Sequence, residues 1–333
     1  MISKKFESYG IKFQPILKDK IWGGSKLKTI LGKPASPNTG ESWEISTVNG
    51  EISVIENGTY SGVKFDDLIA EFQSEILGNM VVEKFGGEFP LLFKYIDAAQ
   101  NLSVQVHPGD EMAKKFHNSY GKTEMWYIIQ ADEKAEINVG WKNEITPEQY
   151  EEVLQNGTIA EHLNFIKVST GDSFFIKAGK VHAIGAGVLL AEIQQTSDVT
   201  YRVYDWDRVD DKGNGRELHI DKARDAMSFI VQDEDSIRYE PKINESSQLV
   251  NCEYFTTNLI AVQGSMQKDY SSLGSFVVFM CVMGEVTISV DGVDENLVYG
   301  QTILIPAAAN VVELSSESAK ILEVFISRDY DQS

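Results

Sequence analysis

The feature that most constrains the fold of this 333-residue chain is a succession of short β-rich segments separated by turn-forming residues. After residue 249 almost every segment follows this pattern, with turns expected at Gly264, Gly284 and Gly300. The same pattern runs through residues 11–60. Because many short strands joined by regular turns favour a sandwich or a barrel, we expect a mainly β fold.

Three stretches interrupt this pattern and are predicted to be helical insertions. Apolar residues recur at spacings of three and four within residues 64–85. The pair Thr146-Pro147 is a typical helix start for residues 146–165, and apolar spacing indicates a third helix over residues 220–231.

The length of the chain suggests about two domains, at roughly 100–200 residues each. Residues 232–248 are polar and charged, which indicates a linker. We therefore predict one domain over residues 1–240, carrying the helical insertions, and a second over residues 241–333.

A weak internal repeat supports two related units. Residues 171–182 can be laid over residues 300–311 at an offset of 300 − 171 = 129, with Gly, Ile and Ala matching. His182 then falls opposite Val311. The repeat indicates two related β-barrels, with polar ligand chemistry in the first and none in the second.

The net charge excludes some classes of partner. Basic minus acidic residues gives 30 − 50 = −20, which argues against binding to nucleic acid or to an anionic membrane surface. We expect neither a secretory signal nor a membrane span, because no apolar run reaches about 18 residues. Cys252 and Cys281 lie in strand-like segments and are expected to be core residues rather than a disulfide. The expected location is the cytoplasm.

Four polar residues form a candidate metal site. Gln105 and His107 are two apart on a predicted strand, so their side chains share one face. Glu124 lies on the turn into a later strand, and His182 follows another turn. One amide, two imidazoles and one carboxylate are suitable ligands for a divalent metal with open positions. Spacing alone leaves open that the two histidines are hydrogen-bonded core or surface residues.

Several ordered motifs resemble those of type I mannose-6-phosphate isomerases (phosphomannose isomerases) of the cupin superfamily. They are IWGG at 21–24, GESWEIS at 40–46, FPLLFKYIDAA at 89–99, LSVQVHP at 102–108 and AEIQQTSDVTYR at 191–202. The resemblance implies two cupin (jelly-roll) barrels, the second without metal. It also implies a zinc enzyme that interconverts mannose 6-phosphate and fructose 6-phosphate through an enediol. Its one zinc ion per chain would be held by Gln105, His107, Glu124 and His182.

The phosphate of such a substrate requires cationic side chains. The resemblance implies that Arg202 is an active-site arginine, and its planar fork suits phosphate or an anionic intermediate. Lys122 precedes Glu124 by two residues, so we expect it near the metal, where it binds phosphate or assists proton transfer. The alternatives are a surface ion pair for Arg202 and a solvated turn lysine for Lys122.

One departure from the family pattern concerns the proton-transfer base. Many members carry a histidine just before the lysine, where this chain has Gly121. Glu192 is then a candidate base, with a role as hydrogen-bond acceptor for a ligand as the alternative. Lys94 lies in an apolar stretch, and Ser103 shares its strand face with the predicted ligands, so both are candidate substrate contacts.

Two other functions remain open from the sequence. The missing histidine motivates a non-catalytic, regulatory cupin that binds sugar phosphates. Open metal positions are also compatible with a cupin oxygenase, although that chemistry has no obvious need for the cations Lys122 and Arg202. The sequence indicates a small-molecule partner and leaves the oligomeric state undefined.

Overall fold

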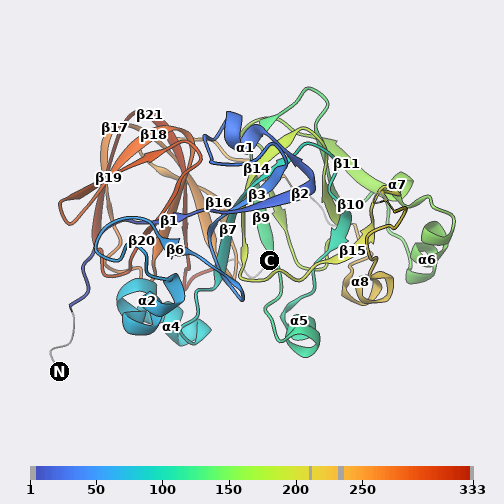
Figure 1. Ribbon diagram of the computed structural model, residues 1–333, viewed down its shortest axis with the longest axis horizontal. Helices are drawn as coiled ribbons and strands as arrows, with labels where there is room; N and C mark the ends of the chain where they lie inside the picture. Colours follow the sequence, from blue (N-terminus) through green and yellow to red (C-terminus); the bar gives the residue numbers. More distant parts are fainter. Residues whose placement is uncertain (1–4, 210–211, 232–235, 331–333) are drawn as a thin grey trace.

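The chain is mainly β, as predicted. The computed structural model describes residues 5–209, 212–231 and 236–330, which form three large β-sheets, a two-stranded sheet and short helices. Figure 1 shows two β units side by side, one built largely from the middle of the chain and one from the C-terminal strands in orange and red. None of the described helices is long and apolar enough to cross a membrane.

The first β unit contains two large sheets. The five-stranded sheet has the order β11 (Leu163–Lys167), β10 (Glu136–Trp141), β13 (His182–Ile184), β8 (Val104–Val106), β15 (Tyr201–Tyr204). The six-stranded sheet has the order β12 (Ser173–Ile176), β9 (Glu124–Ala131), β14 (Val188–Gln195), β7 (Leu91–Ala98), β3 (Thr39–Ile45), β2 (Ile16–Gly24). One buried cluster takes Ile137 and Ile184 from the first sheet and Trp126 and Leu190 from the second, so the two sheets share a core. The small sheet pairs β4 (Thr47–Val48) with β5 (Glu51–Ile52).

The second β unit is an eight-stranded sheet. Its order is β16 (Ser246–Asn251), β17 (Thr256–Asp269), β21 (Val311–Phe325), β18 (Val277–Val290), β20 (Thr302–Ile305), β1 (Ile11–Gln14), β6 (Val54–Ile55), with β19 (Val293–Val298) paired to β18. Its own apolar cluster includes Ile260, Phe279 and Ile321. Because Ile11 pairs with Leu304, an N-terminal strand belongs to this C-terminal sheet.

The described helices are short and lie outside the sheets (Figure 1). They are α1 (Lys26–Thr29), α2 (Phe65–Glu71), α3 (Gln73–Leu77), α4 (Asn79–Phe85), α5 (Asp110–His117), α6 (Pro147–Gln155), α7 (Ile159–His162) and α8 (Ile220–Ala226). The predicted helix over 64–85 is divided into three pieces. Gly78 has a φ of 88° at one division, and a Cβ there would lie 2.3 Å from the carbonyl oxygen of Gly274.

The other two helices end earlier than the sequence predicts. Residues 146–165 begin as expected, with a capping box at Thr146, but the chain enters strand β11 at Leu163. Helix α8 ends at Ala226 rather than at residue 231, because the chain turns extended at Met227. The Ser228 amide then donates to the carbonyl of Gly179, which fixes the segment against a distant loop.

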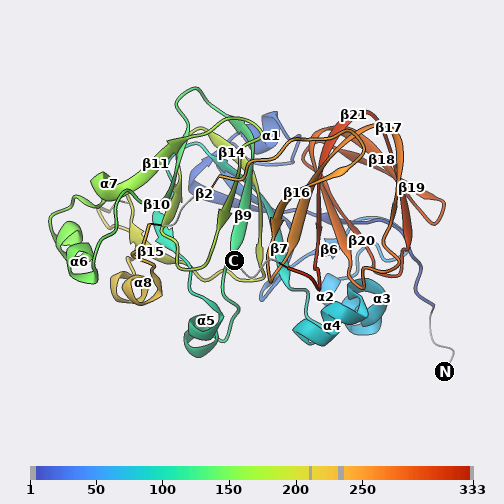
Figure 2. The same cartoon turned by 180° about the vertical axis from the view of Figure 1, so that it is seen from behind.

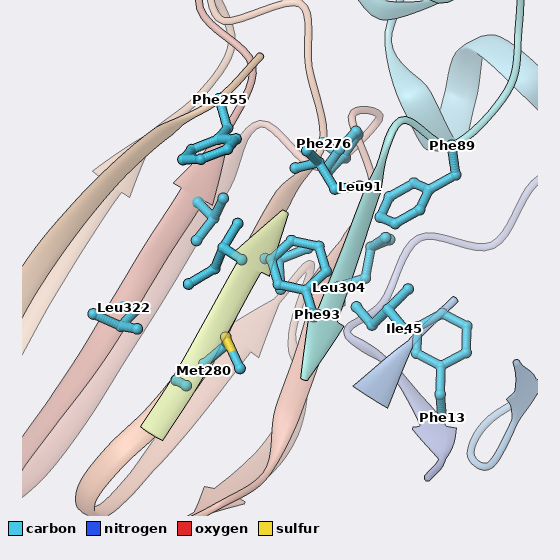
Figure 3. Packing of buried hydrophobic residues seen from close by; sticks show 14 of the residues in the cluster. Phe13, Ile45, Phe89, Leu91, Phe93, Phe255, Phe276, Met280, Leu304 and Leu322 are labelled. Carbon is cyan, nitrogen blue, oxygen red and sulfur yellow. The ribbon is translucent and has the colours of Figure 1, made fainter. Parts of the chain in front are cut away.

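The two β units share an extended cluster of buried apolar side chains. Figure 3 shows Phe89, Leu91 and Phe93 of the first unit in the same cluster as Phe276, Met280 and Leu322 of the second. The rings of Phe89 and Phe276 lie 4.8 Å apart. Burial of this apolar surface stabilises the contact between the units, since removing about 1 Å² from water contributes about 25 cal/mol.

Two of the predictions about organisation are not decided by this architecture. None of the large sheets closes on itself within the described ranges, so the two-barrel arrangement stays a prediction. The boundary near residue 240 also stays a prediction, and the predicted linker lies partly outside the described residues, at 232–235.

Candidate active site

Three predicted metal ligands come together in the first β unit. His107 follows β8, Glu124 begins β9 and His182 begins β13, and all three side chains are buried. Their ligand atoms lie within 4.8 Å of one another. The Nε2 atoms of the two histidines are 3.2 Å apart, and Glu124 oxygens lie 3.6 and 3.5 Å from them. Strand pairing creates this proximity, because His182 is the direct partner of Gln105 across β13 and β8.

The tautomers of both histidines follow from their hydrogen bonds. Nδ1 of His107 donates to the carbonyl of Val199 at 3.0 Å, and Nδ1 of His182 donates to the carbonyl of Lys180 at 2.8 Å. Since a carbonyl only accepts, each Nδ1 carries the hydrogen and each Nε2 presents a lone pair. Burial lowers the pKa of His107 and lowers that of His182 to about 4, which favours neutral rings. Two facing lone pairs are suitable for a cation between them.

The carboxylate of Glu124 is also suited to hold a cation. Both of its oxygens are buried, and neither accepts a hydrogen bond from a described residue. Burial, with repulsion from Glu192, raises its pKa to about 7, although Lys122 Nζ lies 3.2 Å from Oε2. An unsatisfied buried carboxylate costs free energy, and a divalent cation would offset that cost. The donor set therefore fits a metal ion.

Gln105, the fourth predicted ligand, is beside this group. Its amide nitrogen is placed 3.3 Å from Nε2 of His182. The oxygen and nitrogen of an amide are distinguished only by their partners, and a half-turn directs the oxygen toward the same lone pairs and metal position. Gln105 is thus brought to the group as the sequence predicts, while its role as a ligand stays a prediction.

A polar cavity of about 320 Å³ adjoins this group. Six of the predicted site residues line it, namely Lys94, Ser103, Gln105, Lys122, Glu192 and Arg202. The structure therefore brings together residues from four strands, β7, β8, β14 and β15, and from the loops that precede β8 and β9. The three remaining predicted ligands, His107, Glu124 and His182, are buried behind this wall.

Glu192 and Lys94 form a buried ion pair in the cavity wall. Lys94 Nζ donates to Glu192 at 2.9 Å and to Gln194 at 2.6 Å, and Trp126 Nε1 donates to the second oxygen of Glu192. Burial alone would raise the pKa of Glu192, but Lys94 and Lys122 outweigh it and hold that pKa at about 2. Glu192 is therefore ionised and held in one orientation.

Arg202 directs a cationic group toward the cavity. It lies on β15 and pairs with Gln105 of β8, which places it next to the metal group. One guanidinium nitrogen donates to the carbonyl of Glu217, whereas Nε is buried without a described partner. Burial, with repulsion from Arg216, lowers its pKa, so a bound anion would relieve both costs.

The sequence reasoning missed four charged residues of the cavity wall, namely Lys20, Glu41, Asp198 and Arg216. Lys20 and Glu41 form an ion pair of 3.1 Å, and Arg216 is held by hydrogen bonds to Asp205. Lys20 and Glu41 flank or lie within the family-like motifs, which could have singled them out. Arg216 lies in a polar loop with no local motif, so only the folded chain reveals it.

The fold and the donor set define a mainly β protein with a cupin domain and a buried His/Glu/His group able to bind a metal. The chain belongs to the family of type I phosphomannose isomerases. Residues 11–166 match the description "Phosphomannose isomerase type I, catalytic domain", and residues 245–326 match "Mannose-6-phosphate isomerase, cupin domain". The resemblance carried by the sequence motifs is confirmed.

Relatives with known names agree along most of their length. The mannose-6-phosphate isomerase ManA of Bacillus subtilis is 39% identical over 256 residues, which are 76% of this chain and 79% of the relative. The mannose-6-phosphate isomerase of Streptococcus mutans is 37% identical over 274 residues, 82% of this chain and 85% of the relative. The crystal structure of a mannose 6-phosphate isomerase from Bacillus subtilis has a TM-score of 0.85 at 31% identity, covering 96% of this chain and 99% of that one.

Proposed function

We propose that this chain is a zinc-dependent isomerase that interconverts mannose 6-phosphate and fructose 6-phosphate through an enediol intermediate. The observation that carries the proposal is the buried group of His107, Glu124 and His182, in which the Glu124 oxygens accept no hydrogen bond from a described residue, beside a cavity lined by cations. Membership of the family, with relatives named for this activity, supports the choice of substrate.

One zinc ion would be held by His107, Glu124 and His182, with Gln105 as the fourth ligand. Such an ion supplies positive charge that polarises a carbonyl and stabilises negative charge developing on oxygen. Nitrogen ligands with one carboxylate are a set that zinc commonly accepts. The single carboxylate leaves the site with a net positive charge, which suits an anionic intermediate.

The phosphate would be bound by cations of the cavity wall. Arg202 has a buried, unpartnered Nε, and Lys122 is buried beside the metal group. Ser103 can donate its hydroxyl. Lys94 uses two of its three donors on Glu192 and Gln194, so one donor remains for a substrate oxygen. These local cations offset the net charge of −20, which otherwise repels an anionic substrate.

Isomerisation requires a base that takes a proton from the carbon beside the carbonyl and returns it to the neighbouring carbon. Gly121 has no side chain to do so, and Lys122 and Glu192 are the candidates that line the cavity. Lys122 binds phosphate as an ammonium, so to act as the base it must first pass its own proton to another group. Glu192 is a weak base while Lys94 holds its pKa at about 2, so its catalytic role requires that this ion pair loosens when substrate binds.

The proposal is tested by a coupled isomerase assay with and without a chelator. We expect conversion of mannose 6-phosphate that a chelator abolishes and added zinc restores. A folded, zinc-loaded protein that leaves mannose 6-phosphate unconverted would disprove the function. Activity that resists complete removal of metal would disprove the zinc dependence alone.

Gly121 also favours a second candidate, a regulatory cupin that binds sugar phosphate without turnover. Titration calorimetry that shows binding of mannose 6-phosphate, together with no conversion in the assay, would support this alternative. Within the main proposal we also retain a cytoplasmic location and two cupin units, over residues 1–240 and 241–333. Strands β1 and β6 of the first range are then exchanged into the sheet of the second unit.

A further inference from the structure

Asp110 joins three segments of the chain near the candidate site. It is the first residue of α5, and its Oδ1 accepts hydrogen bonds from the backbone N–H of Gly121 at 2.7 Å and from Nε2 of Gln195 at 3.0 Å. Its Oδ2 accepts the hydroxyl hydrogen of Tyr254 at 2.7 Å. The carboxylate thus connects the loop before β9, the end of β14 and the C-terminal part of the chain.

The loop held by Asp110 leads directly into the site. Gly121 precedes Lys122, whose ammonium lies 3.2 Å from Glu124. Gln195 extends the contact, because its side-chain oxygen accepts from the N–H of Thr123 at 2.8 Å. Asp110 itself is not among the described residues that line the cavity. Its influence on Lys122 therefore passes through the backbone of residues 121–123.

The packing around Gly121 shows how close this contact is. A Cβ at position 121 would lie 2.8 Å from the backbone nitrogen of Asp110 and 2.9 Å from its Oδ1. Side chains larger than hydrogen are excluded unless the start of α5 moves. The absence of a side chain at residue 121 and the presence of the Asp110 carboxylate are two parts of one arrangement.

Tyr254 extends this arrangement to the second β unit. It lies between β16 and β17, and Figure 2 shows β16 at the boundary between the two units. Its hydroxyl hydrogen bond crosses 144 residues of sequence to reach Asp110. The second unit, which holds none of the predicted metal ligands, is therefore linked to the loop that carries Lys122.

We propose that Asp110 is a positioning residue that sets the place of Lys122, and that Tyr254 of the second β unit fixes the orientation of Asp110. The kinetic part of this inference rests on the proposed isomerase function. Because a misplacement of about 1 Å at a reacting group can cost up to about 100-fold in rate, a lost tether should be measurable.

The main test compares Tyr254→Phe with Tyr270→Phe in the full-length, zinc-loaded protein. Tyr270 is the matched control, since its hydroxyl also donates to a buried carboxylate of the second unit, Glu323, without a described link to the cavity. We expect Tyr254→Phe to lower kcat about tenfold with zinc content unchanged. Tyr270→Phe should lower thermal stability and leave kcat as it was. Equal kcat values for both variants would overturn the inference.

A second comparison tests whether the hydrogen bonds of Asp110, rather than its charge, position Lys122. Asp110→Asn keeps an oxygen for Gly121 and Gln195, and its amide can donate to the hydroxyl of Tyr254. We expect kcat within about threefold of the wild type for Asp110→Asn, and a loss of about tenfold or more for Asp110→Ala. An Asn variant as impaired as the Ala variant would contradict positioning by these hydrogen bonds.

Hydrogen exchange separates a failure of this inference from a failure of the proposed function. Peptides that span residues 119–125 should exchange faster in Tyr254→Phe than in Tyr270→Phe, whether or not the protein is an isomerase. If the wild type lacks activity, the function is wrong and the exchange result alone decides the tether. Equal exchange in both variants would disprove the tether even in an active enzyme.

Discussion

Each β unit contains a buried carboxylate with a lysine ammonium nearby, at 3.2 Å for Glu124 and 2.9 Å for Glu323, and the two carboxylates differ in the hydrogen bonds that they accept. Glu323 of the second unit accepts hydrogen bonds from Ser246, Asn258 and Tyr270 and lies 2.9 Å from Lys268 Nζ. Glu124 of the first unit accepts none from the described residues. Both side chains are fully buried, so burial by itself does not distinguish them.

The electrostatic consequences of this difference have opposite signs. Burial favours the protonated form of both groups, but Lys268 and the hydrogen bonds from Tyr270 and Asn258 hold the pKa of Glu323 below its usual range. The pKa of Glu124 is instead raised to about 7, by burial and by Glu192. A buried acid with all its donors present is a structural element, whereas one without donors indicates a binding site for a cation.

The largest expected effect comes from His182→Ala, which removes a proposed ligand from the group that contains Glu124. We expect zinc content to fall below detection and activity to fall by about 1000-fold or more, because the stabilisation of developing charge is lost. His162→Ala, in helix α7 away from the cavity, is the control. Metal analysis checks the prediction, and a variant that keeps one zinc per chain would contradict the ligand assignment.

The next largest effect is expected at Arg202, which lines the same cavity and is proposed to bind the anionic phosphate. Arg202→Ala should lower kcat/KM about 100-fold with zinc content unchanged, since a charge-assisted contact is lost while the ligands stay. Arg224→Ala is the matched control, because Arg224 forms only exposed ion pairs with Glu151 and Asp225 among the described residues. Steady-state kinetics measure both variants. Unchanged kinetics for Arg202→Ala would refute a role in binding phosphate or the intermediate.

Replacing each carboxylate by a neutral amide in the metal-free protein compares directly what Glu323 and Glu124 contribute to the free energy of unfolding. Glu323→Gln should lower the free energy of unfolding by about 3 kcal/mol, because it leaves Lys268 without its buried partner. Glu124→Gln should change it by less than about 1 kcal/mol, because loss of the contact with Lys122 offsets the removal of a buried charge that accepts no hydrogen bond. Urea unfolding at pH 7 measures both. A loss of stability for Glu124→Gln equal to that for Glu323→Gln would show that the two carboxylates are alike.

The smallest effect is the pH dependence of the same two variants. Because the folded pKa of Glu323 is depressed, its stabilisation is complete above about pH 4.5, its ordinary value, and is lost as pH falls through the folded pKa. The difference between wild type and Glu323→Gln should therefore shrink at acid pH. The raised pKa of Glu124 acts oppositely, so metal-free stability should fall as pH rises from about 4.5 to about 7. Unfolding curves of the wild type at several pH values detect both trends, with Glu323→Gln as the reference for the first and Glu124→Gln for the second.

The internal repeat shows that the local sequence predicts the positions of some strands and turns. At the offset of 129, β12 (Ser173–Ile176) coincides with β20 (Thr302–Ile305), since 173 + 129 = 302 and 176 + 129 = 305. The aligned glycines before these strands, Gly171 and Gly300, both have positive φ, of 95° and 82°. Turns of this kind depend on the residues within them, which is why the sequence predicts them.

The position at which a helix ends is a feature that the local sequence does not predict here. Helix α8 ends at Ala226 because Ser228 bonds to the loop of Gly179, about fifty positions earlier in the chain. Nothing in residues 220–231 encodes that partner. The same holds for Arg216, whose place in the cavity wall depends on its hydrogen bonds to Asp205 and on the course of the loop between them.

The sequence by itself determined the mainly β class, the family and the kinds of side chain that meet at the site. These properties follow from turn chemistry, strand alternation and ordered motifs, which are local. Only the tertiary structure decided that Glu124 lacks hydrogen-bond donors, that Lys94 is committed to Glu192, and that Tyr254 reaches Asp110. Such contacts join residues far apart in the chain, and they exist only after the sheets have packed and excluded water.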